Sequence, residues 1–235
     1  MKTLSYLLSV VLVLFTVNVS FAGQFGPAEP TAKEGKPSIG VGYFYSESKM
    51  KSSDTGNLVF KSNQRYLQGS FSFIKNWEVF GRIGGADMKE HASGFKDGMK
   101  TFGSLGVRGL LYDDGLFGFG PVIQGNIYSN YSDTAISGGV PERLTVENSW
   151  DGSVGLAAQI KKDRFIVYYG PFVYMARNKL KVRTPFSYDS TTLKEKQNLG
   201  GFLGVNVLAI KSLNICIEGQ YTGRFSVGGT VNYSF

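Results

Sequence analysis

Apolar and polar side chains alternate along the carboxyl-terminal part of the chain. In residues 225–235 the odd positions are apolar or glycine, and the even positions are glycine or small and polar. The same alternation recurs in residues 199–209 and 213–221, and further upstream in residues 150–160. Because a period of two places alternate side chains on opposite faces of a β-strand, these segments predict four strands with one apolar and one polar face.

Six more segments carry a weaker form of this alternation. They are residues 38–48, 64–74, 77–87, 101–112, 116–128 and 164–177. The segments are 11 to 14 residues long, close to the about 9 to 11 residues with which a tilted strand crosses a bilayer. We therefore predict an all-β fold, an antiparallel up-and-down transmembrane β-barrel of about ten strands, with eight as the alternative.

The connections between these strands alternate in length. Four of them are tight turns, at residues 75–76, 113–115, 161–164 and 210–212. Four others are long polar segments, at residues 49–62, 88–100, 129–148 and 178–196. Short periplasmic turns opposite long extracellular loops are typical of outer-membrane barrels.

The amino terminus carries a different pattern. Lys2 is followed by an apolar run over residues 4–19 and by small residues at Ser20 and Ala22. This arrangement is typical of a secretory signal peptide, so we assign residues 1–22 to the signal and expect cleavage after Ala22. An uncleaved membrane anchor is the alternative.

The mature chain is expected to contain one domain. Residues 23–37 hold several prolines and charges without a period, and they predict a flexible periplasmic segment. Residues 38–235 form the barrel domain. The composition, with 31 Gly, 13 Tyr and 18 Phe, is that of strands and turns.

Three features limit the chemistry that the chain can perform. One cysteine, Cys216, and one histidine, His91, can form neither an intramolecular disulfide nor a His/Cys metal cage, and the acidic residues lack calcium-loop spacing. A net charge of +7 is modest for an exported chain and indicates no nucleic-acid partner. We predict no metal and no cofactor.

The carboxyl terminus, Val231-Asn232-Tyr233-Ser234-Phe235, together with the signal peptide and the amphipathic strands, resembles small outer-membrane β-barrel proteins of Gram-negative bacteria. The resemblance covers residues 38–235. It implies a location in the cell outer membrane, in contact with outer-membrane lipids and lipopolysaccharide. In that group a final aromatic residue, with apolar residues at alternate positions before it, is the signal read by the barrel-assembly machinery. Val231, Tyr233 and Phe235 match those positions.

Ten strands also invite comparison with omptins, outer-membrane proteases that use acidic residues and an Asp-His pair at the outer rim. His91 lies in a predicted outer loop, but the adjacent pair Asp113-Asp114 lies in a predicted periplasmic turn. Barrel enzymes that trim lipid A use a His and a Ser on a strand, whereas His91 and Ser93 fall in a loop. We predict no catalytic residue and a non-enzyme, with a rim-active hydrolase as the disfavoured alternative.

The alternation directs five charged side chains into the lumen. They are Glu78, Arg82, Arg108, Asp151 and Glu218. Because an unpaired buried charge costs several kcal/mol of desolvation, we predict an ion-pair network among them. Two interpretations remain open for this network, a structural plug and a gate inside a narrow pore.

The outer segment at residues 178–196 is rich in lysine and arginine. Such a patch could contact lipopolysaccharide phosphates or an acidic surface, or be only solvated. The pattern therefore predicts a structural or surface-interaction role in the envelope, with a possible extracellular surface ligand. The alternative is a narrow, passive, porin-like channel for small solutes. A soluble ligand-carrying barrel would need an apolar interior, which this chain lacks.

Overall fold

The computed structural model describes residues 25–52, 56–90, 94–137, 140–196 and 198–235. Over these residues the chain forms one 13-stranded sheet. No helix in the described part of the chain is long and apolar enough to cross a membrane. His91 and the proposed cleavage position after Ala22 lie outside the described residues.

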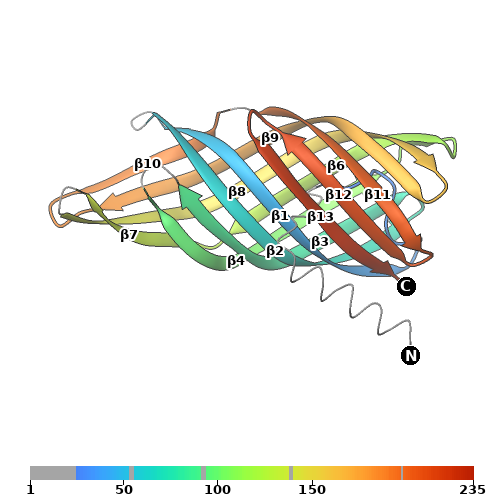
Figure 1. The fold of residues 1–235 in the computed structure, drawn as a ribbon, viewed down its shortest axis with the longest axis horizontal. Helices are drawn as coiled ribbons and strands as arrows, with labels where there is room; N and C mark the ends of the chain where they lie inside the picture. The colour runs from blue at the N-terminus through green and yellow to red at the C-terminus, as the bar shows by residue number, and fades with distance from the viewer. Residues whose placement is uncertain (1–24, 53–55, 91–93, 138–139, 197) are drawn as a thin grey trace.

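Ten of the strands build the wall of a barrel (Figure 1). They are β1 (Pro37–Ser52), β2 (Gly56–Ile74), β3 (Trp77–Glu90), β4 (Lys96–Gly109), β6 (Phe117–Tyr128), β8 (Val140–Lys162), β9 (Phe165–Arg183), β11 (Leu199–Ile210), β12 (Leu213–Tyr221) and β13 (Phe225–Ser234). Three shorter strands are β5 (Tyr112–Asp113), β7 (Tyr131–Ser137) and β10 (Tyr188–Glu195).

The barrel is closed by its first and last strands. Each wall strand pairs antiparallel with the next wall strand along the chain, and β13 pairs with β1 from Ser38↔Ser234 to Tyr45↔Val227. Closure leaves no unpaired sheet edge along this seam, which is the condition for a sheet to lie in lipid. The predicted ten-stranded antiparallel up-and-down barrel is confirmed.

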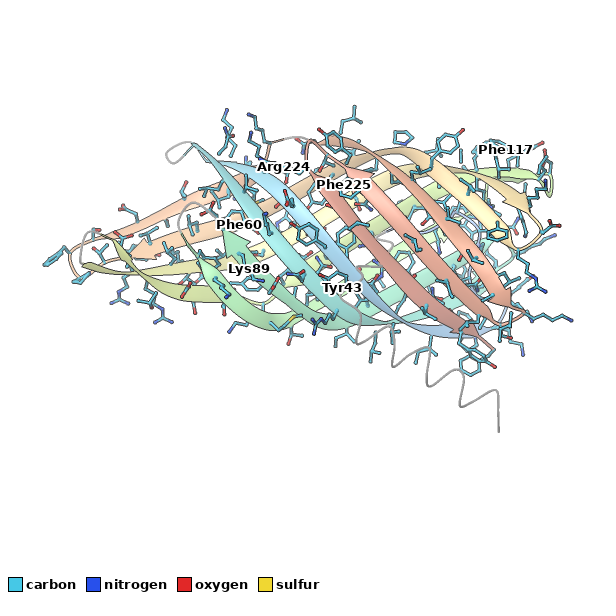
Figure 2. The ribbon with its side chains drawn as sticks, in the orientation of Figure 1. Tyr43, Phe60, Lys89, Phe117, Arg224 and Phe225 are labelled. Atoms are coloured by element: carbon cyan, nitrogen blue, oxygen red, sulfur yellow. The ribbon has the colours of Figure 1, made fainter. Side chains whose placement is uncertain are left out.

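Side chains alternate between the two faces of the wall as the sequence pattern predicted. Leu203 is 60% exposed and Ile217 is 41% exposed, whereas Glu218 is fully buried and Asn232 is 1% exposed. Exposed aromatic residues lie near both ends of the apolar belt, with Phe117 near the periplasmic end and Phe225 further toward the outside (Figure 2). An apolar exterior around a polar interior is the reverse of a soluble barrel and fits a lipid environment.

The outer ends of the strands are longer than predicted. The four segments expected to be long loops lie mostly in strands, because β1 and β2 extend to Ser52 and Gly56, and β7 and β10 fall inside the expected loops. Strand structure therefore reaches further into these segments than the sequence pattern predicted. The physical reason is that inward positions of these extensions are apolar and bury one another in a shared cluster.

The number of strands in the wall differs between the periplasmic part and the outer part of the barrel. The β12–β13 hairpin ends at Tyr221↔Phe225. Beyond this hairpin, β10 pairs with β9 on one side and with β1 on the other, through Met50↔Glu195 and Lys51↔Lys194. The outer part of the barrel therefore lacks two of the strands present below, and its interior is narrower.

The apolar belt generates a depth-dependent prediction on a single strand. Leu203→Arg places a cation near the middle of the belt and is expected to destabilise the barrel by about 2 to 4 kcal/mol. Leu199→Arg, nearer the outer boundary, is expected to cost about 0 to 1 kcal/mol. Urea unfolding of protein refolded into lipid vesicles measures both. Equal losses at the two positions would contradict the assignment of the belt to lipid.

Candidate functional site

The interior of the barrel contains the amino-terminal segment. Phe25 and Ala28 are fully buried and Ala32 is 5% exposed. The ring of Phe25 lies 5.0 Å, centroid to centroid, from the lumenal rings of Phe172 and Phe202. Residues 25–32 therefore plug the lumen, whereas the sequence predicted a flexible periplasmic lead-in for residues 23–37. Aromatic burial inside the barrel explains the difference.

Glu218, on β12, holds the start of this plug. Its carboxylate accepts hydrogen bonds from the backbone N–H groups of Phe25 at 3.2 Å and Gly26 at 2.9 Å. It also accepts hydrogen bonds from the Tyr168 hydroxyl at 3.0 Å and from Nε2 of Gln220 at 2.7 Å. Four hydrogen-bond donors therefore surround this fully buried carboxylate, and two of them belong to the plug.

An ion pair holds the other end of the plug. Nη2 of Arg108 lies 2.5 Å from Oε1 of Glu78. Glu78 also accepts a hydrogen bond from the backbone N–H of Ala32 at 2.8 Å and from the hydroxyl of Thr31 at 3.0 Å. Arg108 in turn donates to the carbonyl oxygen of Phe25 at 3.2 Å. The pair thus binds both ends of the plug.

Two further contacts tie the plug to the wall. Lys161 forms an ion pair with Glu29 at 2.5 Å, and the hydroxyl of Ser234 donates to the carbonyl oxygen of Thr31 at 2.5 Å. Strand position alone predicts which way these charges face, and it does not predict that a segment of chain lies between them. The available signal was an excess of inward charge near the periplasmic end, together with an apolar Phe25 in an otherwise polar segment.

Arg82 fills the middle of the lumen. It donates from Nε to Gln68 at 2.8 Å and from Nη1 to Gln124 at 3.0 Å. Its guanidinium carbon lies 4.9 Å from the ring centroid of Tyr66 and 5.0 Å from that of Phe80. Amide oxygens and aromatic faces stabilise a cation in a confined site.

Asp151 lies further toward the outside. It accepts hydrogen bonds from Nδ2 of Asn126 at 2.5 Å and from the hydroxyl of Tyr128 at 2.6 Å. All five predicted lumen charges are buried and face inward. The structure brings Glu78 and Arg108 into direct contact, and it links both of them to Glu218 through the plug.

A third layer closes the outer part of the lumen. It consists of eight buried side chains contributed by strands that extend beyond the β12–β13 hairpin and by the β3–β4 connection, which we call the outer apolar cluster. Its members are Met50, Phe60, Met88, Phe95, Tyr131, Leu144, Val146 and Leu193. The sequence analysis did not predict this cluster, since its members fall in segments expected to be polar loops.

The periplasmic mouth of the barrel is hollow. A cavity of about 340 Å³ lies there, between the plug and the turns that follow β2, β8 and β11. Its lining includes five cationic side chains, Lys33, Lys75, Lys161, Arg164 and Lys211. A second cavity of about 30 Å³ lies beside Asp151 and Tyr174, with room for few water molecules.

Both candidate catalytic chemistries require His91, which lies outside the described residues. Those residues contain no group of three or more His, Cys, Asp or Glu side chains that could hold a metal ion. Asp114 lies in the periplasmic turn before β6, where hydrogen bonds from the backbone N–H groups of Phe117 and Leu116 lower the pKa of its carboxyl. Asp114 therefore stabilises a turn.

Of the predicted assembly signal, Val231 and Tyr233 lie on the outer face of β13, and Phe235 follows this strand directly. Tyr233 is 41% exposed and Phe235 is 57% exposed, with ring centroids 5.3 Å apart. Val231 pairs with Val41 of β1, at the strand seam that closes the barrel. These side chains face the lipid side of the wall.

This architecture is similar to that of solved outer-membrane proteins. The outer membrane protease OmpT from Escherichia coli matches with a TM-score of 0.52 at 9% identity, over 85% of this chain and 97% of that one. The translocator domain of the autotransporter NalP from Neisseria meningitidis matches with a TM-score of 0.50 at 12% identity, over 86% and 90%. The chain has the outer-membrane β-barrel fold. No family model and no curated protein matches the sequence.

The buried Glu78–Arg108 pair generates a prediction about stability. Arg108→Met leaves a fully buried carboxylate without its cation and is expected to cost about 3 to 5 kcal/mol of unfolding free energy. The double variant Glu78→Gln/Arg108→Met removes both charges and should recover part of that loss. Urea unfolding in vesicles measures both variants. A double variant less stable than Arg108→Met would argue against the pair.

The plug can be tested by cysteine labelling in a Cys216→Ala background. A maleimide should modify Ala28→Cys at least about tenfold more slowly than Lys33→Cys, because residue 28 is buried and residue 33 is exposed. Urea-unfolded samples of both variants should label at the same rate. Equal labelling of the two folded variants would show that the segment lies outside the lumen.

Proposed function

We propose that this protein is a non-enzymatic outer-membrane barrel with a closed lumen, and that its role is performed by its exterior as an envelope scaffold and interaction surface. The observation that carries the proposal is that the lumen is filled at three heights, by the plug, by Arg82 with its amide and aromatic neighbours, and by the outer apolar cluster. A conducting pore needs a continuous polar path, and an apolar constriction stops ions by excluding water.

The filling of the lumen at several heights favours a structural interpretation of the lumen charges over a gate. Arg82 is held by Gln68 and Gln124 within the wall, and it lies between two other filled layers. Moving Arg82 alone would leave the outer apolar cluster in place. The charges therefore act as packing and hydrogen-bonding groups that fill a polar interior.

The proposal includes a route of export and a set of partners. The chain would pass the inner membrane on a signal peptide cleaved after Ala22. The barrel-assembly machinery would read Val231, Tyr233 and Phe235 on the exposed face of the closing strand. Outer-membrane lipids and lipopolysaccharide would surround the apolar belt, and the strand extensions would present an extracellular surface to a ligand.

The closed lumen yields a conductance prediction. In planar bilayers, the folded protein and the Arg82→Ala variant should both show no ion conductance above the bare membrane, because the outer apolar cluster remains. Heat-modifiable gel mobility confirms that each sample is folded. The reference is the Leu193→Ser/Val146→Ser variant, which places polar groups in that cluster. Steady conductance of the unmodified protein would favour the alternative, a narrow channel for small solutes.

A further inference from the structure

The outer face of β9 carries a line of cations. Arg177, Lys179, Lys181 and Arg183 occupy alternate positions on this strand. The intervening Asn178 is buried, and Leu180 and Val182 pack against the outer apolar cluster. The four cations therefore point away from the barrel, on the part of β9 that extends beyond the β12–β13 hairpin.

Register brings other cations beside this line. Arg177 pairs with Lys194 of β10, and Lys194 pairs on its other side with Lys51 of β1. Three cations on three adjacent strands therefore lie in one cross-strand row, and all three are exposed. Directly opposed like charges on one face of a sheet destabilise the pairing, so a row of this kind gains stability when an anion binds across it.

The carboxylates of the described residues do not neutralise this row. Among the described residues, no Asp or Glu oxygen lies within 4.0 Å of the charged groups of Lys51, Arg177 or Lys194. Elsewhere on the same face Lys181 is paired with Glu147 at 2.5 Å. On this face a carboxylate therefore lies beside Lys181, whereas none of the described carboxylates lies beside the row.

The position of the row along the membrane normal indicates which kind of molecule binds to it. On its β8 side, Arg177 pairs with Trp150, which is 42% exposed. Amphipathic aromatic side chains favour the boundary between hydrocarbon and water. The row therefore lies where the headgroups of the outer leaflet meet the barrel, on a sheet face that points sideways into the membrane plane.

We propose that the row formed by Lys51, Lys194 and Arg177 binds the phosphate groups of the phosphorylated glycolipid of the outer leaflet, with its acyl chains against the apolar belt below. Lysine and arginine form charge-assisted hydrogen bonds with phosphate oxygens. Thr192, the next outward position to Lys194 on β10, supplies a hydroxyl partner for sugar hydroxyls beside the row. The inference deepens the proposed interaction surface and rests on it.

The test uses the full-length mature protein in phosphatidylcholine nanodiscs, titrated with diphosphorylated lipid A and with the same lipid after enzymatic dephosphorylation. Native mass spectrometry or fluorescence titration reports the dissociation constants. The variant is Lys51→Gln/Arg177→Gln/Lys194→Gln. The matched control, Lys33→Gln/Lys75→Gln/Lys211→Gln, removes the same charge from exposed residues at the periplasmic end.

The unmodified protein and the control triple should bind diphosphorylated lipid A about tenfold or more tightly than the dephosphorylated lipid, and the row triple should lose this preference. If gel mobility shows that the row triple folds poorly, the single variant Lys194→Gln, which removes only the central cation, replaces it. This variant should show a smaller loss of the preference for diphosphorylated lipid A. The proposal is wrong if the row triple keeps the preference, if both triples lose it equally, or if inorganic phosphate or a soluble sulfated glycan binds as tightly as the lipid.

This outcome is separable from the conductance result. A barrel that conducts and still prefers phosphorylated lipid overturns the closed-lumen proposal alone. A barrel that does not conduct and shows no phosphate preference overturns the glycolipid site alone.

Discussion

Satisfaction of backbone hydrogen bonds in a medium without water is the constraint on which this structure depends. Each wall strand pairs on both sides, and β13 returns to β1, so the sheet has no open edge at the seam. Closure in turn creates an inside that must be filled, because the small residues and charges that face inward cannot face lipid. The plug, the central arginine and the outer apolar cluster are three different solutions to this filling problem.

These solutions differ because their surroundings differ. Near the periplasmic end, ten strands leave room for a segment of chain, and buried Glu218 and Glu78 are hydrogen-bonded by its backbone N–H groups. Toward the outside, the loss of the β12–β13 hairpin brings opposite walls closer, and apolar side chains fill the narrower interior directly. The five lumen charges thus lie in the wide part of the barrel, and the outer apolar cluster fills its narrow part.

Local pattern was sufficient to predict the wall and insufficient to predict the contents. Alternation alone placed Leu203 outside and Glu218 inside, since facing in a strand depends only on position parity. The plug and the outer apolar cluster depend on contacts between residues far apart in the chain, such as Phe25 with Phe202, for which no periodicity exists. The extended strands were missed because polar outward residues masked apolar partners such as Leu193 and Met50 at alternate positions.

The placement of the plug has a consequence for the order of events during biogenesis. Its receptor groups are on β3, β4 and β12, which come together only after nearly the whole chain has entered the sheet. Residues 25–32 can therefore dock only after the last hairpins are in place. Docking of the plug is a final step of assembly, and a bulky group attached to Phe25 would interfere with that step while leaving the wall itself able to form.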